Sequence, residues 1–203
     1  MLHDVQRPSL GRLAMLIGGC LILGTGVAML LTADLGSDGY STLVNGVSIG
    51  VEMPFFVANL VVSVVFIALA AARQVRPGIG TVVQILVVGF VADRLLRLLD
   101  TPGSVTGQSL LLVAALPVLS LGIACYLGAQ LGAGPVEGAG LAWDPPVPFR
   151  WSYSAVQLLG ALVGWLLGAT IGPGTVAVVL LLGPAVDLTS RMLRLDVHQK
   201  MDP

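Results

Sequence analysis

The chain has 203 residues, of which 56% are hydrophobic and only 10% are charged, and its formal net charge is −1. A soluble domain carries about 25% charged residues, so this chain has too few polar side chains to face water on all sides. Its mean hydropathy of +0.94 indicates that lipid surrounds most of it. The near-neutral net charge gives no indication of a nucleic-acid partner.

Six long apolar runs follow one another along the chain after a short polar segment. At about 1.5 Å per residue, runs of this length cross or nearly cross the roughly 30 Å hydrocarbon layer of a bilayer. The expected spans are 13–33, 54–72, 78–99, 109–131, 151–171 and 174–195. The sequence therefore predicts an all-α membrane protein with six transmembrane helices in one membrane domain covering 1–203.

One stretch of the sequence appears twice. An offset of 94 places residues 78–99 on 172–193, and both copies begin with Gly-x-Gly-Thr-Val and carry Asp and then Arg near their ends. An offset of 96 relates the ends of the first and fourth spans in the same way. Because each copy, about 11–100 and about 107–195, holds three spans, the second copy must enter the membrane from the opposite side. We therefore expect two inverted three-helix repeats.

The distribution of cations gives the orientation, because cytoplasmic loops are enriched in Lys and Arg. With the N-terminus in the cytoplasm, only Arg94 and Arg97 lie outside. The cations on the cytoplasmic side are then Arg7, Arg12, Arg73, Arg76, Arg150, Arg191, Arg194 and Lys200. We expect a multi-pass protein of the bacterial inner (plasma) membrane with both termini in the cytoplasm.

Asp93 and Asp187 occupy equivalent positions near the ends of the third and sixth spans. If Gly78 lies at one membrane boundary, Asp93 lies roughly 22 Å along the helix and about 8 Å short of the other boundary. A charge at that depth is costly and should face protein or water. Arg97 and Arg191, four residues further on, share the helix face of each Asp. Each pair is either an ion or proton site or a gate, or a helix-end ion pair that only anchors the helix.

Thr81 and Thr175 follow a Gly-x-Gly sequence at the start of the third and sixth spans. A threonine in the first turn can cap free N–H groups, and the positive end of the helix dipole can meet an anionic substrate. Close packing of small residues explains the same pattern without a ligand.

The segments 34–52 and 132–149 follow equivalent spans and are rich in glycine. Backbone that is not helical is tolerated at membrane depth only where protein or a water-filled cavity surrounds it. Asp38, Asn45 and Glu137 therefore either line a substrate cavity in re-entrant segments or belong to ordinary surface loops.

Three isolated amides, Asn59, Gln84 and Gln157, lie inside expected spans. They either contact a substrate or hydrogen-bond across helices, for about half to one kcal/mol each.

The sequence holds no phosphate-binding loop, no His/Glu cluster with metal-ligand spacing and no Ser/His or Cys/His pair placed for catalysis. His3 and His198 lie in the terminal segments. Cys20 and Cys125 lie in apolar runs, which is not the pattern of a disulfide framework or a zinc site. We expect no enzymatic activity, no catalytic or metal site and no cofactor.

The Gly-rich segments at 36–43 and 132–141 and the two Gly-x-Gly-Thr helices ending in Asp are similar to those of the YczE/YyaS/YitT group of bacterial integral membrane proteins. The resemblance covers nearly the whole chain. It implies six spans with a Gly-rich segment after the first, and it implies no particular activity. Residues 132–135 match the group better than 35–38, which lack the proline.

This architecture favours a secondary transporter or exporter of a small solute or ion along the repeat interface, by analogy with other inverted-repeat proteins. The alternatives are a substrate-binding membrane subunit of a larger transport complex and a non-transporting structural or regulatory membrane protein. The expected partners are the lipid bilayer and the solute or ion, and the sequence permits a homodimer without requiring one. The expected binding residues are Asp38, Asn45, Thr81, Gln84, Asp93, Glu137, Gln157, Thr175 and Asp187.

Overall fold

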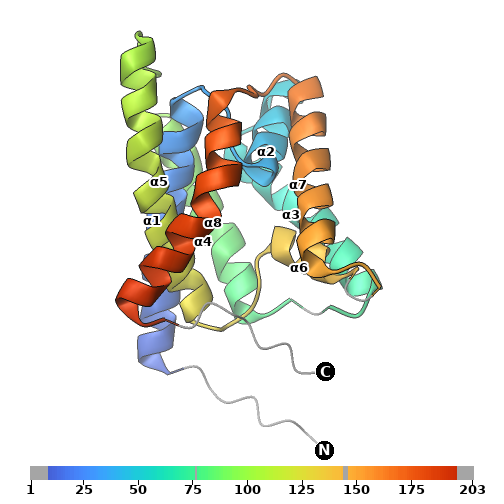
Figure 1. Cartoon of the computed structure of the whole chain (residues 1–203). Coiled ribbons are helices and arrows are strands. Elements are labelled where there is room, and N and C mark those ends of the chain that lie inside the picture. The colour runs from blue at the N-terminus through green and yellow to red at the C-terminus, as the bar shows by residue number, and fades with distance from the viewer. Residues whose placement is uncertain (1–8, 76, 144–145, 196–203) are drawn as a thin grey trace, which may run out of the picture.

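A computed structural model describes residues 9–75, 77–143 and 146–195, and within these ranges the regular structure is all helical (Figure 1). The helices are α1 (Leu10–Thr32), α2 (Gly39–Gly50), α3 (Phe55–Ala72), α4 (Ile79–Leu96), α5 (Val105–Gly128), α6 (Pro135–Leu141), α7 (Phe149–Leu166) and α8 (Pro173–Leu193).

The helices begin where the sequence supplies a cap or a proline. Ser9, Asp38 and Ser104 precede α1, α2 and α5, and each side chain accepts a hydrogen bond from a backbone N–H of the first turn. Such caps satisfy N–H groups that have no partner inside the helix. Pro54 and Pro148 precede α3 and α7. Because these prolines are 94 residues apart, the sequence repeat extends to α3 and α7 as well.

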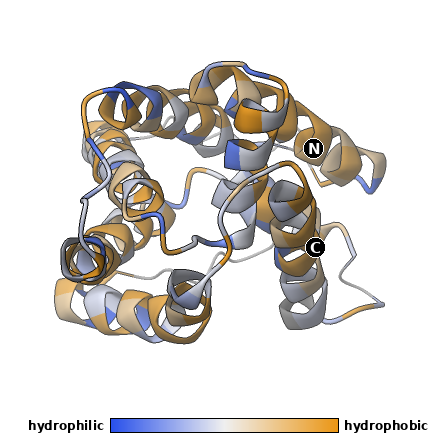
Figure 2. Cartoon of the chain, turned by 90° about the horizontal axis from the view of Figure 1, so that it is seen from above, coloured by the Kyte–Doolittle hydropathy of each residue, from blue (hydrophilic) through white to orange (hydrophobic). Residues whose placement is uncertain are grey.

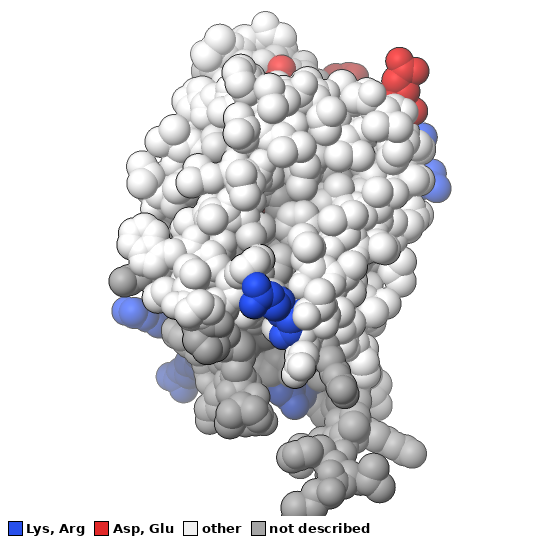
Figure 3. All heavy atoms as spheres, turned by 90° about the vertical axis from the view of Figure 1, so that its right-hand side faces the viewer, with Lys and Arg blue, Asp and Glu red and all other residues white. Residues whose placement is uncertain are grey.

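In the part of the chain that the structure describes, five helices, α1, α3, α4, α5 and α8, are long and apolar enough to cross a membrane. The protein is therefore a helical, membrane-embedded, multi-pass protein. Hydrophobic residues prevail along the long helices (Figure 2), and charged side chains gather toward the two ends of the molecule, with a broad uncharged band between them on the face shown in Figure 3.

The sixth expected span, 151–171, differs from the prediction. Its helix α7 ends at Leu166, and its first half carries polar residues, among them Ser152 and Gln157, so it is not among the five apolar helices. Gly168, at φ +103°, follows the helix and ends it, because this backbone conformation is incompatible with continuing the helix and favours glycine.

The eight helices form two groups. In one group α1 packs against α4 and α5, and α5 packs against α8. In the other, α2 and α6 each pack against both α3 and α7. The contact between α3 and α4 joins the groups. Each group therefore contains equivalent helices from both copies of the sequence repeat.

Helices α1 and α5, which correspond in the sequence repeat, pack antiparallel through reciprocal glycine contacts. A Cβ built on Gly26 would lie 2.8 Å from the Leu119 side chain, and one built on Gly122 would lie 2.5 Å from the Leu23 backbone. Gly26 and Leu23 are the repeat equivalents of Gly122 and Leu119. The same pair of residues thus meets twice, which is the pattern of a two-fold relationship between the two copies.

Parts of the segments 34–52 and 132–149 lie in the interior, whereas 49–52 and 146–148 are exposed. The first contains α2 and the second contains α6, and most residues of α6 and several of α2 are buried. In Figure 1 the chain turns inward after α1 before α2 runs back toward the same end of the molecule, and α6 enters from the opposite end. The start of α1, the ends of α3 and α8 and the start of α7 lie at the lower end in this view.

Candidate binding site between the short helices

The repeated Gly-x-Gly-Thr motif of each copy binds the backbone of the other copy. Gly80 N donates a hydrogen bond of 2.7 Å to Leu131 O, and Gly174 N donates one of 2.7 Å to Leu35 O. A Cβ built on Gly80 would lie 2.9 Å from the Leu131 carbonyl carbon, so only glycine allows this approach. The motif is therefore a backbone docking point at the entrance to each short helix.

The two threonines of the motif are occupied by the backbone. Thr81 Oγ1 donates to Ala133 O at 2.5 Å and accepts from Gly78 N at 3.1 Å. Thr175 Oγ1 accepts from Gly172 N at 3.4 Å. Both hydroxyls act as caps at the start of α4 and α8, which is the packing interpretation of the sequence pattern.

A chain of polar side chains runs from α3 through α2 to α7. Tyr40 Oη lies 3.0 Å from Asn59 Oδ1 and 2.8 Å from Ser63 Oγ. Tyr40 N donates to Gln157 Oε1 at 2.9 Å, and Gln157 Nε2 donates to Tyr153 Oη at 2.9 Å. The expected binding residue Gln157 is thus a fixed part of the contact between α2 and α7.

Three buried polar atoms near the start of α6 have no hydrogen-bond partner. Among the described residues, four buried side-chain oxygens lack one: those of Thr32, Gln84 (Oε1), Tyr126 and Glu137 (Oε2). A Cβ built on Gly134 would meet Glu137 Oε2 and would lie 2.5 Å from Gln84 Oε1. An unsatisfied buried polar group costs about 1–3 kcal/mol, so three such atoms close together indicate a site for a ligand or water.

Negative charge and phenol groups surround Glu137. The carboxylate of Asp38, which caps α2 by accepting from Ser41 N at 3.0 Å, lies within electrostatic range. Tyr126 and Tyr153 interact electrostatically with Glu137 as well. Glu137 lies in α6, outside the five apolar spans, and burial, together with the nearby charge of Asp38, raises the pKa of its carboxyl to about 7. Although the residue is only half-buried, its Oε2 is buried.

A small pocket lies beside this cluster, between α3, α6 and the start of α4. Its volume of about 30 Å³ holds a water molecule or two. Thr81 and Gly134 line it together with apolar residues of α3 and of the turn that follows. The cluster is therefore next to a small space between α3, α4 and α6.

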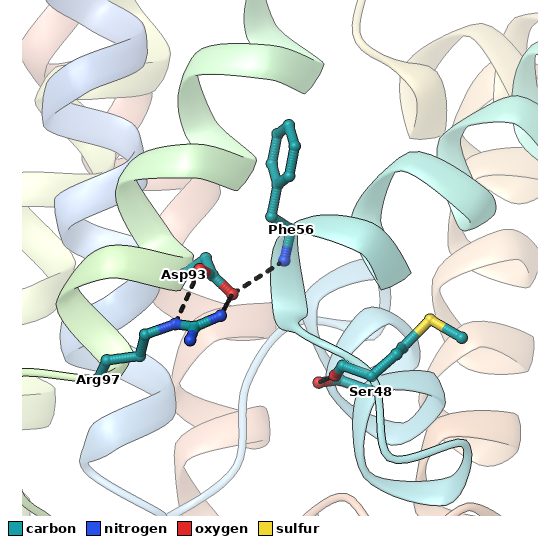
Figure 4. A network of polar contacts seen from close by, with 5 residues as sticks. Ser48, Phe56, Asp93 and Arg97 are labelled. Carbon is teal, nitrogen blue, oxygen red and sulfur yellow. Dashed lines mark hydrogen bonds and ion pairs between the residues drawn. The ribbon is translucent and has the colours of Figure 1, made fainter.

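Asp93 joins two helices at the opposite end of α4 (Figure 4). Its Oδ2 accepts a hydrogen bond from Arg97 Nε at 3.0 Å, and its Oδ1 accepts one from Phe56 N at 3.3 Å. The Asp93 carboxylate is nearly buried, whereas the Arg97 side chain is 57% exposed. Asp93 therefore caps the start of α3, which the sequence did not reveal, besides pairing with Arg97.

The equivalent ion pair between Asp187 and Arg191 is absent. Both residues are exposed, and among the described residues no ion pair joins them. Whereas α3 packs against α4, α7 packs against α2 and α6. Asp187 consequently has no helix start to cap, and the expectation of two equivalent pairs is wrong for the second one.

The expected binding residues thus separate into groups. Asp38, Gln84, Glu137 and Gln157 lie in or beside the interior cluster, and Asn45 is half-buried further along α2. Thr81 and Thr175 are caps, and Asp93 and Asp187 lie at helix ends. Sequence analysis missed Tyr126 and Tyr153. A tyrosine inside an apolar run was the available signal, because its hydroxyl usually needs a partner when buried.

The model of a family described as "Family of unknown function (DUF6198)" matches residues 10–191. An uncharacterized protein of Haemophilus influenzae (strain ATCC 51907 / DSM 11121 / KW20 / Rd) is 24% identical over 176 residues, which cover 86% of this chain and 81% of that protein. No solved structure matches.

Proposed function

The chain belongs to the DUF6198 family, and from its interior we propose that it is a secondary transporter that moves a small solute or ion between its two groups of helices. The proposal includes α7 as a sixth span and places the two copies of the repeat in opposite orientations in a bacterial inner membrane. The resemblance to the YczE/YyaS/YitT group is part of the same proposal.

One observation carries this function: equivalent helices of the two copies are in different arrangements. In the first copy α3 packs closely against α4. The side chains of Asn59 and Phe56 lie against Gly89, and the ring centroids of Phe56 and Phe90 are 6.3 Å apart in an edge-to-face arrangement. In the second copy, a Cβ built on Gly183, the equivalent of Gly89, would have no neighbour within 4 Å among the described residues.

The unused residues of the second copy fit a second state. Gly183 and Asp187 are the equivalents of Gly89, against which α3 packs, and of Asp93, which caps the start of α3. In this arrangement they make no equivalent contact with α7. In the second state α7 packs against α8, Asp187 caps the start of α7, and α3 leaves α4. Exchange between two such arrangements opens a central site alternately to each side of the membrane.

The present arrangement is then the inward-facing one. The start of α7 is separated from α8 at the end of the molecule where α1 begins and α8 ends (Figure 1). The cation distribution assigns that end to the cytoplasm. The Asp93 contact closes the other end.

Engineered disulfides test the exchange without knowledge of the solute. A Cβ built on Gly89 would lie 3.2 Å from Asn59 Cγ, so the pair Asn59→Cys with Gly89→Cys has a spacing suited to a disulfide. The equivalent pair is Tyr153→Cys with Gly183→Cys. Both pairs are placed in a chain whose Cys20 and Cys125 are replaced by Ala.

We expect each pair to form a disulfide in membranes under mild oxidation, and we expect the two disulfides to be mutually exclusive in the quadruple variant. Gly138→Cys, at a position that lines the pocket and where an added Cβ would meet only Ala70 Cβ at 3.8 Å, should react with a membrane-impermeant thiol reagent from one side when the first pair is locked and from the other side when the second is locked. Failure of the second pair to form while the first forms readily would favour a static binding subunit or a structural membrane protein instead.

A further inference from the structure

We propose that Glu137 is the coupling site of this transporter, where a proton and a small cationic solute bind in alternation. This inference rests on the proposed function and adds the substrate class. It begins from two carboxyl groups that interact electrostatically, those of Asp38 and Glu137.

No described cation neutralises this pair of carboxyl groups. Arg12 Nε donates to Ala129 O at 3.0 Å, and Arg97 pairs with Asp93. Arg73 stacks on the Trp143 ring at 4.1 Å, and Arg94 lies over the Phe90 ring. An anionic solute would therefore meet net repulsion at Glu137, whereas a cation would meet attraction.

The groups around Glu137 suit a small cation. Gln84 Oε1 and Glu137 Oε2 are acceptors without a donor, and the Tyr126 hydroxyl, which lies near the Gly134 backbone, makes no hydrogen bond of good geometry. Tyrosine rings attract cations through their faces as well as through their oxygens. The adjacent pocket of about 30 Å³, which Thr81 and Gly134 line and Glu137 does not, has room for a monovalent metal ion or a small ammonium next to these groups.

The cation and the proton cannot bind the Glu137 carboxyl at the same time. A buried carboxylate without a counter-ion is strongly unfavourable, so Glu137 is stable either as the neutral acid or as a carboxylate that holds a cation. When the cation arrives, the O–H bond breaks, the proton leaves to water and the carboxylate keeps the electron pair, so charge is conserved. This exclusion couples outward movement of one ion to inward movement of the other.

Several groups face Glu137 from the helices packed around it. They are Asp38 at the start of α2, Tyr40 of α2, Gln84 of α4, Tyr126 of α5 and Tyr153 of α7. Asp38 remains engaged as a cap of α2 through Ser41 N. Glu137 is thus the carboxyl with an unpartnered oxygen, and we expect it to be the one that exchanges its proton.

Proton release on cation binding tests the inference directly. The whole protein in detergent is held in weak buffer with a pH-sensitive dye near pH 7, which is about the pKa of Glu137. The chlorides of Na⁺, K⁺, ammonium, methylammonium and choline are added separately at constant ionic strength. We expect at least one cation to release a substantial fraction of one proton per chain, and Glu137→Gln to abolish the release.

Asp100→Asn is the matched control, because Asp100 is an exposed carboxylate in the loop before α5, and its release should equal that of the wild type. Comparable thermal unfolding of the wild type and Glu137→Gln at acidic pH, where both side chains are neutral, shows that the variant is folded. The inference is overturned if none of the five cations releases protons from the wild type, or if Glu137→Gln releases as many.

The disulfide experiment separates this result from the proposed function. If the two disulfides are mutually exclusive but no cation releases protons, the proposed transport function stands and the proposed coupling site at Glu137 is overturned. Proton release in a chain whose second disulfide never forms supports the cation site and overturns transport by the exchange described above.

Discussion

The Gly80 amide donates a hydrogen bond of 2.7 Å to the Leu131 carbonyl, so the start of α4 in the first copy of the repeat is tied to the segment that leads into α6 in the second. Gly174 and Leu35 repeat this bond from the second copy to the first. The two crossed bonds hold each short helix against the long helix of the other copy. The interior cluster between the short helices depends on them.

Gly132→Ala should destabilise the protein. Gly132 has φ +130°, and an added Cβ would lie 2.9 Å from Gly78 Cα and 3.2 Å from Thr81 Oγ1. Backbone strain at positive φ together with this contact should cost about 2–3 kcal/mol. Thermal unfolding in detergent measures the loss. Gly103→Ala is the control, because a Cβ there meets nothing within 4 Å, and equal unfolding temperatures for the two variants would contradict the crossed-bond arrangement.

Asp93→Asn should weaken the contact between α3 and α4. The variant loses the charged cap on Phe56 N and the pairing with Arg97. We expect a loss of about 1–2 kcal/mol, mostly from the cap, because the exposed Arg97 contributes little. Asp187→Asn, which removes a carboxylate without a partner, should leave stability within about 0.5 kcal/mol. Chemical or thermal unfolding of the two variants side by side checks this, and equal losses would refute the asymmetry between the two copies.

Stability should depend on pH through Glu137. Its folded-state pKa is raised from 4.5 to about 7, so its favourable contribution is complete below pH 4.5 and is lost as the pH rises through 7. In Glu137→Gln this loss is absent. The difference in unfolding free energy between the variant and the wild type should therefore grow between these pH values by on the order of 1–3 kcal/mol. A constant difference across the range would show that the carboxyl does not titrate there.

Two Tyr→Phe variants should behave differently. Tyr40→Phe removes a hydroxyl bonded to Asn59 and Ser63, and the loss should be about 1–2 kcal/mol. Tyr126→Phe removes a buried hydroxyl that lies near the Gly134 backbone but makes no hydrogen bond of good geometry, so it should cost less stability than Tyr40→Phe. The same variant should weaken cation-dependent proton release. Unfolding curves and the dye measurement, made on both variants, distinguish a structural hydroxyl from one that serves a ligand.

The internal repeat and the composition of the sequence predict much of the fold. The Gly-x-Gly-Thr copies at 78–81 and 172–175 predict equivalent long helices, and the low charge content predicts the membrane. Both properties are visible along the chain because they depend on which residues recur and at what spacing. Five of the six expected spans are long and apolar enough to cross a membrane, and α7 is less apolar because its first half supplies polar groups to the interior.

The cluster of Gln84, Tyr126 and Glu137 became visible only in the folded chain. Their repeat equivalents are Val178, Leu30 and Ser41, so no symmetry in the sequence marks the three residues as a set, and they come from three different helices. The contrast between Asp93 and Asp187 has the same origin: the sequence makes these residues equivalent, whereas packing gives a helix start to one and leaves the other exposed. Spacing along the chain determines which residues share a helix face, but only the packing of separate helices decides which polar groups meet and which stay without a partner.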